Sequence, residues 1–119
     1  MDFDILNGLT IIHITGCDHG SSELTFFTQE GRVFQQSHYQ DCCESVLVED
    51  IIGDVSDLIG SPILRAEERS NRLQNGDYGD VEEWTFYELA TINGSVTIRW
   101  IGTSNGYYST SVSFVEIDK

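Results

Sequence analysis

The sequence predicts an α+β domain: a mostly antiparallel sheet of about six to eight strands with one short helix near residues 51–59. Three observations support this. Short runs rich in β-branched and aromatic residues recur between clusters of Gly, Asp, Asn and Ser, a pattern typical of strands joined by turns. Two Asn-Gly dipeptides, at 93–94 and 105–106, mark hairpin turns. One stretch carries apolar residues at helical spacing.

The first third of the chain predicts a three-stranded meander. Strands are expected at 9–15, 23–28 and 32–39, because each run is rich in Ile, Thr, Phe or Val and is bounded by turn-forming residues. A fourth strand is expected at 46–48.

The predicted helix follows this fourth strand and ends before Gly60 and Pro62. Its stripe consists of apolar residues three or four positions apart: Ile51, Ile52, Val55, Leu58 and Ile59. Residues 63–68 are a candidate further strand. Residues 71–80 are expected to form a loop, because Asn, Gly and Asp are concentrated there.

The last third predicts a ribbon over 84–117 that forms the spine of the sheet. A two-residue turn at Asn93-Gly94 would pair Leu89 with Ile98 and Glu88 with Arg99. A three-residue loop at 104–106 would continue the ribbon, since only that length keeps its apolar residues on one face. The expected core then comprises two sets facing each other: Leu89, Val96, Ile98, Trp100, Val112 and Phe114 from the ribbon, and Ile52, Val55 and Ile59 from the helix.

The 119 residues suit a single domain, 1–119, with an acidic surface. Twenty acidic residues against six basic ones give a formal charge of −14. Direct binding of nucleic acid is therefore not expected, because that affinity depends on cations that neutralise phosphates. No membrane span or signal peptide is expected, and three cysteines, an odd number, suggest reduced thiols in a cytoplasm.

A run of six carboxylates without Lys or Arg, within 38–62, is the candidate partner-binding surface. Such a run concentrates negative potential and predicts a partner with a basic surface. Tyr107 and Tyr108 follow a tight turn and are candidate contacts, because aromatic residues are enriched at binding hot spots. The acidic candidates are Asp41, Glu44, Glu49, Asp50, Asp54 and Asp57.

A metal site or a small enzyme centred on 38–44 is the alternative, with His38, Asp41, Cys42 and Cys43 as ligands. Adjacent cysteines on a strand point to opposite sides, so both could bind one zinc ion only at a sharp turn. The remaining ligands could come from His13, Cys17 or His19. No cofactor is expected under the main interpretation.

A sponge for a signalling nucleotide is a further alternative. It needs a local positive pocket in an acidic chain, formed by residues distant in sequence. The candidates are Arg65, Trp84, Arg99 and Tyr107.

Two segments carry a family resemblance. One begins Tyr-Gln-Asp-Cys-Cys-Glu at 39 and continues to 68, and the other begins Trp-Thr-Phe-Tyr-Glu-Leu-Ala at 84 and continues to 114. The chain resembles a family of uncharacterised small proteins of tailed phages and prophages. The resemblance implies a phage accessory protein acting in the host bacterial cytoplasm, and it implies no catalytic residues.

The leading hypothesis is therefore a phage-encoded, non-enzymatic binding protein that inhibits a host factor. A defence nuclease complex such as CRISPR–Cas is the most plausible target, since its basic groove holds nucleic acid. The acidic surface would occupy that groove as a nucleic-acid mimic.

Overall fold

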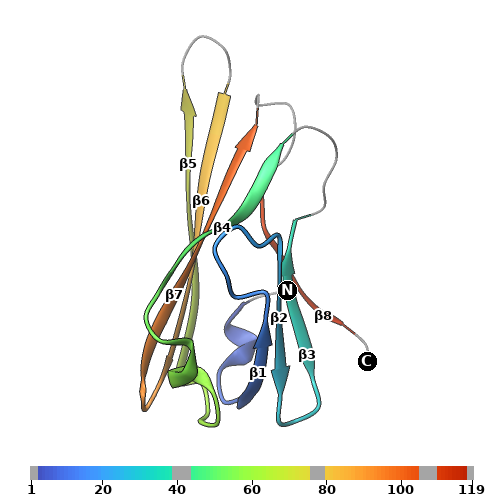
Figure 1. Ribbon diagram of the computed structural model, residues 1–119, viewed down its shortest axis with the longest axis vertical. Coiled ribbons are helices and arrows are strands. Elements are labelled where there is room, and N and C mark those ends of the chain that lie inside the picture. Colours follow the sequence, from blue (N-terminus) through green and yellow to red (C-terminus); the bar gives the residue numbers. More distant parts are fainter. Residues whose placement is uncertain (1–2, 39–43, 76–79, 105–109, 118–119) are drawn as a thin grey trace.

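The computed structural model describes residues 3–38, 44–75, 80–104 and 110–117, and within these ranges it contains eight strands and two 3₁₀ turns (Figure 1). The strands form two four-stranded sheets, and every pair of neighbouring strands is antiparallel. The first sheet has the order β1 (Ile11–Thr15), β2 (Glu23–Thr28), β3 (Val33–Ser37), β8 (Ser113–Ile117). The second has the order β4 (Ser45–Ile52), β7 (Gly94–Ser104), β6 (Asp80–Thr91), β5 (Arg65–Asn75). The 3₁₀ turns are η1 (Phe3–Leu6) and η2 (Val55–Leu58).

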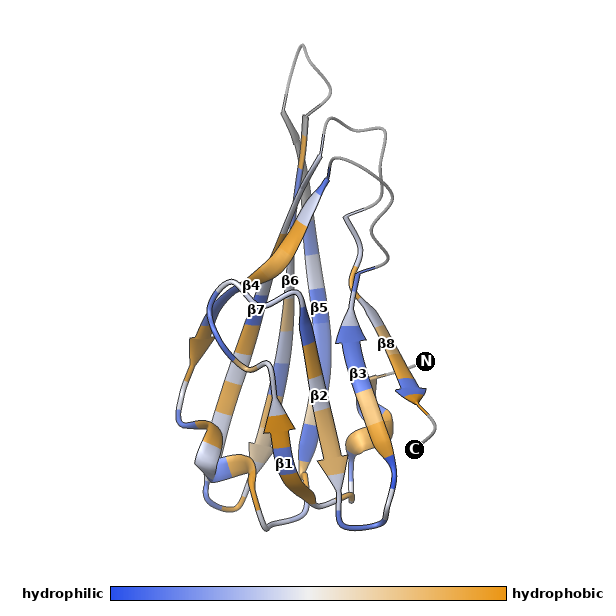
Figure 2. Cartoon of the chain, turned by 45° about the vertical axis from the view of Figure 1, so that its right-hand side comes forward, coloured by the Kyte–Doolittle hydropathy of each residue, from blue (hydrophilic) through white to orange (hydrophobic). Residues whose placement is uncertain are grey.

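The core lies between the two sheets, which face each other as a β-sandwich. Hydrophobic and hydrophilic residues alternate along β7 (Figure 2), as expected for a strand with one buried face. Phe3 of η1 packs between the layers, its ring centroid 4.7 Å from that of Tyr87 and 5.0 Å from that of Phe114. The largest fully buried side chains come from both sheets: Leu24, Phe26, Phe34 and Gln36 from the first, and Tyr87, Leu89, Ile98 and Trp100 from the second.

The antiparallel, strand-rich prediction is confirmed, and the meander of the first third is present as β1, β2 and β3. The predicted strand at 23–28 matches β2 residue for residue. No described helix is long and apolar enough to cross a membrane.

The predicted helix at 51–59 is wrong. Ile51 and Ile52 extend β4, where they pair with Ile98 and Thr97, and only Val55–Leu58 form a 3₁₀ turn. Gly53 explains the break: its φ of 115° is unsuited to a helix, and a Cβ there would lie 2.5 Å from a backbone oxygen of β7. The strand alternation leaves Ile52 51% exposed, so it does not face the core as predicted.

The hairpin of β6 and β7 has the predicted faces but a register shifted by two residues. Leu89 pairs with Val96 instead of Ile98, and the turn residues are Ile92 and Asn93. Asn93 does not adopt positive φ, so the predicted turn type is absent. A tertiary contact explains the observed register, because the Thr91 hydroxyl donates to the backbone oxygen of Asp57 in η2.

The predicted loop at 71–80 is mostly strand. β5 continues through Asn75 and β6 begins at Asp80, so the two pair along their whole length. They run side by side along the long axis of the molecule (Figure 1). Local turn composition is overridden here by a continuous ladder of backbone hydrogen bonds.

The ribbon predicted over 84–117 is also wrong at its last strand. β8 pairs with β3 in the opposite sheet, with Phe114 opposite Gln36, and does not pair with β7. Phe114 is nevertheless buried as predicted, because it reaches the same core from the other layer. In β-sandwiches, consecutive strands can belong to different sheets. Alternation of apolar and polar residues cannot distinguish such a pair of strands from a hairpin within one sheet.

Candidate acidic binding surface

The predicted partner-binding residues that the structure describes lie in different settings. Asp41, Tyr107 and Tyr108 lie outside the described residues, as do Cys42 and Cys43 of the metal alternative. The described carboxylates are Glu44, Glu49, Asp50, Asp54 and Asp57.

Glu44 is buried and belongs to a clasp with His38. The Nε2 atom of His38 lies 2.8 Å from Oε2 of Glu44, and the two side chains are 4% and 0% exposed. The Nδ1 atom lies 2.6 Å from the backbone oxygen of Ser111, which can only accept, so Nδ1 carries a proton. This clasp joins the segments that follow β3, precede β4 and precede β8, and it holds Glu44 inside the fold.

Glu49 and Asp50 lie at a bulge of β4 and face an arginine. Nε of Arg99 donates to Oε2 of Glu49 at 2.6 Å, and one guanidinium nitrogen lies 3.6 Å from Oδ2 of Asp50. The same guanidinium lies 5.3 Å from the Trp84 ring centroid. Two of the predicted carboxylates therefore share one cation partner, Arg99, within the chain.

Asp54 and Asp57 lie at η2. The backbone nitrogen and the hydroxyl of Ser56 both donate to Oδ1 of Asp54, at 3.0 and 2.7 Å. These bonds, the hydroxyl bond first, hold the pKa of Asp54 below its ordinary range. Asp54 is an N-cap that stays ionised, and neither it nor Asp57 has a cation partner in the described part of the chain.

Each arginine with a described side chain is paired with a carboxylate. Arg32 binds Glu116 at 2.9 Å, and Arg65 and Arg69 both bind Glu88. Arg99 binds Glu49 and Asp50, as above. The nucleotide-sponge alternative therefore has Arg99 and Trp84 in contact, but both its arginines are already neutralised, and its Tyr107 lies outside the described residues.

A larger set of carboxylates has no cation partner among the described residues. The nine members include several that no sequence pattern marks, because they are scattered along the chain between 4 and 83. They are Asp4, Asp18, Glu23, Glu30, Asp54, Asp57, Glu68, Glu82 and Glu83. The excess negative charge is thus spread over both sheets and both 3₁₀ turns.

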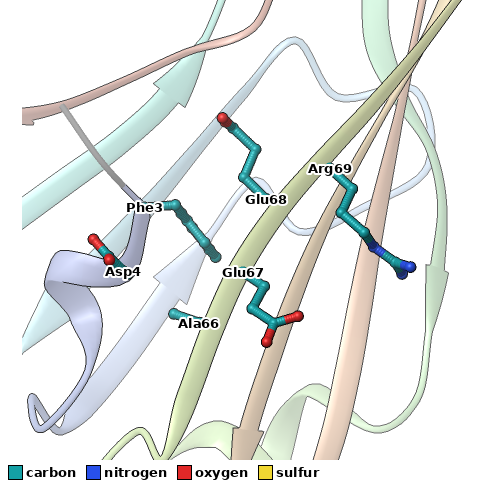
Figure 3. A pocket seen from close by; sticks show the side chains of 6 residues that line it. All are labelled: Phe3, Asp4, Ala66, Glu67, Glu68 and Arg69. Atoms are coloured by element: carbon teal, nitrogen blue, oxygen red, sulfur yellow. The ribbon is translucent and has the colours of Figure 1, made fainter.

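Two of these carboxylates border a hollow between η1 and β5. The hollow has a volume of about 380 Å³ and is lined by Phe3, Asp4, Ala66, Glu67, Glu68 and Arg69 (Figure 3). Phe3 and Ala66 are 3% and 2% exposed and form an apolar floor. Sequence reasoning missed this site, because Asp4 and Glu68 are distant in sequence and come together only when η1 packs against β5.

The metal alternative is not decided by the described residues. Among them, no group of three His, Cys, Asp or Glu side chains could hold an ion, but Asp41, Cys42 and Cys43 lie outside this set. His38 would have to give up one of its two hydrogen-bond partners to coordinate a metal. Burial, with a smaller effect of Asp18, raises the pKa of the Cys17 thiol to about 11, so Cys17 is protonated at neutral pH and is a poor nucleophile.

Comparison with known proteins gives a family without an assigned activity. A family model described as a domain of unknown function, DUF7448, matches residues 6–114. No curated protein and no solved structure matches the chain.

Proposed function

We propose that the chain, which belongs to the DUF7448 family of domains of unknown function, is a non-enzymatic binding protein whose acidic surface occupies a basic groove of a partner protein. The observation that supports this most directly is the charge pairing. Every arginine with a described side chain is held by a carboxylate, whereas nine carboxylates have no cation partner among the described side chains. A basic partner could therefore be bound without breaking an internal ion pair.

The same charge pattern disfavours phosphate as a ligand. An anion approaching Arg65, Arg69 or Arg99 would have to compete with Glu88 or Glu49 for the guanidinium and would be repelled by those carboxylates. A protein groove lined by Lys and Arg is favoured instead, because its cations would supply counter-charges to the carboxylates that have no cation partner among the described side chains.

The finer proposal is that the partner is a host defence complex and that the chain is a phage-encoded inhibitor acting in the bacterial cytoplasm. Its support is the resemblance of 39–68 and 84–114 to small phage and prophage proteins. A groove that normally holds nucleic acid is rich in Lys and Arg, and a small chain of charge −14 could fill it as a competitor.

Affinity capture from bacterial lysates at two salt concentrations tests this function. The immobilised chain should retain a basic, nucleic-acid-binding protein at about 0.05 M salt and lose most of it at about 0.5 M, because the Debye length shrinks about threefold. Duplex DNA added at the low salt concentration should release the same protein. Capture that resists both salt and DNA would contradict binding through the acidic surface.

A further inference from the structure

We propose that two copies of the chain associate through β5, whose edges pair antiparallel so that the two second sheets become one continuous sheet. This inference goes beyond the proposed function, because it concerns a second copy of the chain and not a host protein.

β5 is the longest open sheet edge among the described strands. It has eleven residues, and in the described part of the chain it pairs with β6 alone. The edge of β4 is partly covered, because the backbone nitrogen of Val48 donates to the oxygen of Ser21 and the Val48 oxygen accepts from Gly20, both at 2.7 Å. β1 is preceded by a bridge to Pro62 and bridged to Ile59, and β8 has only five residues. An open edge presents backbone N–H and C=O groups that can pair with another strand.

Two hollows follow this edge. The first, of about 380 Å³, is lined by four consecutive residues of β5, 66–69, and by η1 (Figure 3). The second, of about 260 Å³, is lined by three consecutive residues, 69–71, and by Phe86. Successive residues of a strand point to opposite faces of the sheet, so a hollow lined by consecutive residues reaches the side of the strand. The space beside β5, where a paired strand would lie at about 4.8 Å, is therefore open along 66–71.

The charge of β5 suits pairing with a copy of itself. Three arginines, at 65, 69 and 72, outweigh two glutamates, at 67 and 68, so the strand has a formal charge of +1 in a chain of −14. The other edge strands differ, since β4 carries two carboxylates, β8 carries one, and neither contains Lys or Arg. Two copies can therefore meet at β5 without bringing acidic edges together.

A two-fold axis through Ser70, the midpoint of β5, gives the register of the pairing. It pairs all eleven residues and places Glu68 of each copy opposite Arg72 of the other, with no like charges directly opposite. An axis one residue earlier would bring Arg69 opposite Arg69. An axis one residue later, at Asn71, would leave no pair of opposite charges. Charge complementarity therefore favours the axis at Ser70.

Sedimentation velocity of the full chain at about 0.15 M salt measures the self-association. The chain should show a monomer–dimer equilibrium with a dissociation constant on the order of tens of micromolar, as expected for a small interface. Hydrogen exchange at about 5 and 500 µM chain should locate the contact, because only dimerisation through this edge adds protection at alternate amides of 65–75. A chain that stays monomeric at the higher concentration, or added protection confined to other elements, would overturn the proposal.

Charge reversal tests the register. Glu68→Arg puts like charges opposite each other at both symmetric positions and should weaken the dimer about tenfold, although it lowers the net negative charge. Glu68→Arg combined with Arg72→Glu restores opposite charges and should bring the dissociation constant back to within about threefold of the unmodified chain. Glu23→Arg makes the same change of charge at an exposed position on β2, and it should not weaken the dimer.

Equal weakening by Glu68→Arg and Glu23→Arg would contradict this register, as would a double variant that is folded but stays monomeric. Circular dichroism and urea denaturation establish that each variant is folded. If a variant does not fold, the exchange protection of the unmodified chain decides the proposal, because protection outside 65–75 rules out this edge.

Discussion

The indole Nε1 of Trp100 donates a hydrogen bond of 3.0 Å to Oε1 of Gln36, and this bond joins the two sheets through the middle of the core. Both side chains are 0% exposed. Trp100 lies on β7 of one sheet and Gln36 on β3 of the other, so the bond fixes how the layers face each other. The Gln36 side-chain nitrogen has no hydrogen-bond partner among the described groups. The bond from Trp100 to the Gln36 oxygen is therefore the interaction that compensates for the burial of this amide.

Trp100→Ala should lower the free energy of unfolding by about 3–5 kcal/mol, since it opens a large cavity and leaves Gln36 without its donor. Urea denaturation measures the change. Thr103→Ala, an exposed position on the same strand, should change stability by less than about 0.5 kcal/mol. The reverse order would show that β7 does not face the core as described.

A double-mutant cycle isolates the hydrogen bond from the cavity. Trp100→Phe removes the donor, Gln36→Leu removes the acceptor, and the double variant removes both. The double variant should be about 1 kcal/mol more stable than the sum of the single changes predicts, because no polar group remains buried without its partner. Strict additivity would mean that the bond does not contribute to stability.

The clasp of His38 and Glu44 should contribute more to the free energy of unfolding than an exposed ion pair does. Removing His38 takes a hydrogen-bonded partner from the buried Glu44, so His38→Ala should lower the free energy of unfolding by about 3 kcal/mol. Arg32→Ala, which breaks an exposed pair with Glu116, should cost less than about 1 kcal/mol. Similar losses in the two variants would indicate that the clasp is open to solvent.

Asp54 should make the fold sensitive to acid at η2. Its pKa is lowered in the folded state by Ser56, so its contribution to stability is present above its unfolded value of about 3.8 and is lost as the pH falls through the folded value. Ser56→Ala should return the pKa of Asp54 toward that ordinary value, as followed by NMR titration of its carboxyl carbon. An unchanged titration would show that the hydroxyl does not act on Asp54.

Cys17 should react slowly with thiol reagents at neutral pH. Its pKa of about 11, raised chiefly by burial, keeps it protonated until the solution is strongly alkaline. In a Cys42→Ser, Cys43→Ser variant, the alkylation rate should rise with an apparent pKa near 11 instead of near 9. Stability should fall over the same range, because the unfolded chain loses this proton first.

Much of the fold could be predicted from alternation alone. The apolar face of β6 and β7 follows directly from the spacing of Leu89, Ile98 and Trp100, and all three are buried. The register could not be predicted, because it depends on contacts between the hairpin turn and η2. The helix prediction failed because Ile51, Val55 and Leu58 have the spacing of a helical stripe although they belong to a strand and a 3₁₀ turn. Gly53 separates these two elements, and the spacing of the apolar residues does not reveal the break.

The candidate binding surface was harder to predict from the sequence than the fold. A run of carboxylates gives the sign of the surface, but it does not show that Glu44 is buried against His38 or that Glu49 pairs with Arg99, which lies 50 residues away. The hollow at η1 is a tertiary feature, because Asp4 is brought to Glu68 by packing and no local pattern marks either one. The net charge of the chain therefore follows from its composition, whereas the pairing of individual carboxylates with cations does not.

The rate at which the captured partner binds, measured as a function of salt, tests the central claim most directly. If unpaired carboxylates guide the chain onto a basic groove, the association rate constant should fall at least tenfold between about 0.05 and 0.5 M salt, while the dissociation rate constant changes much less. Asp4→Asn with Glu68→Gln should lower the association rate at the low salt concentration. An association rate constant that stays within about twofold across this range would contradict binding through the acidic surface.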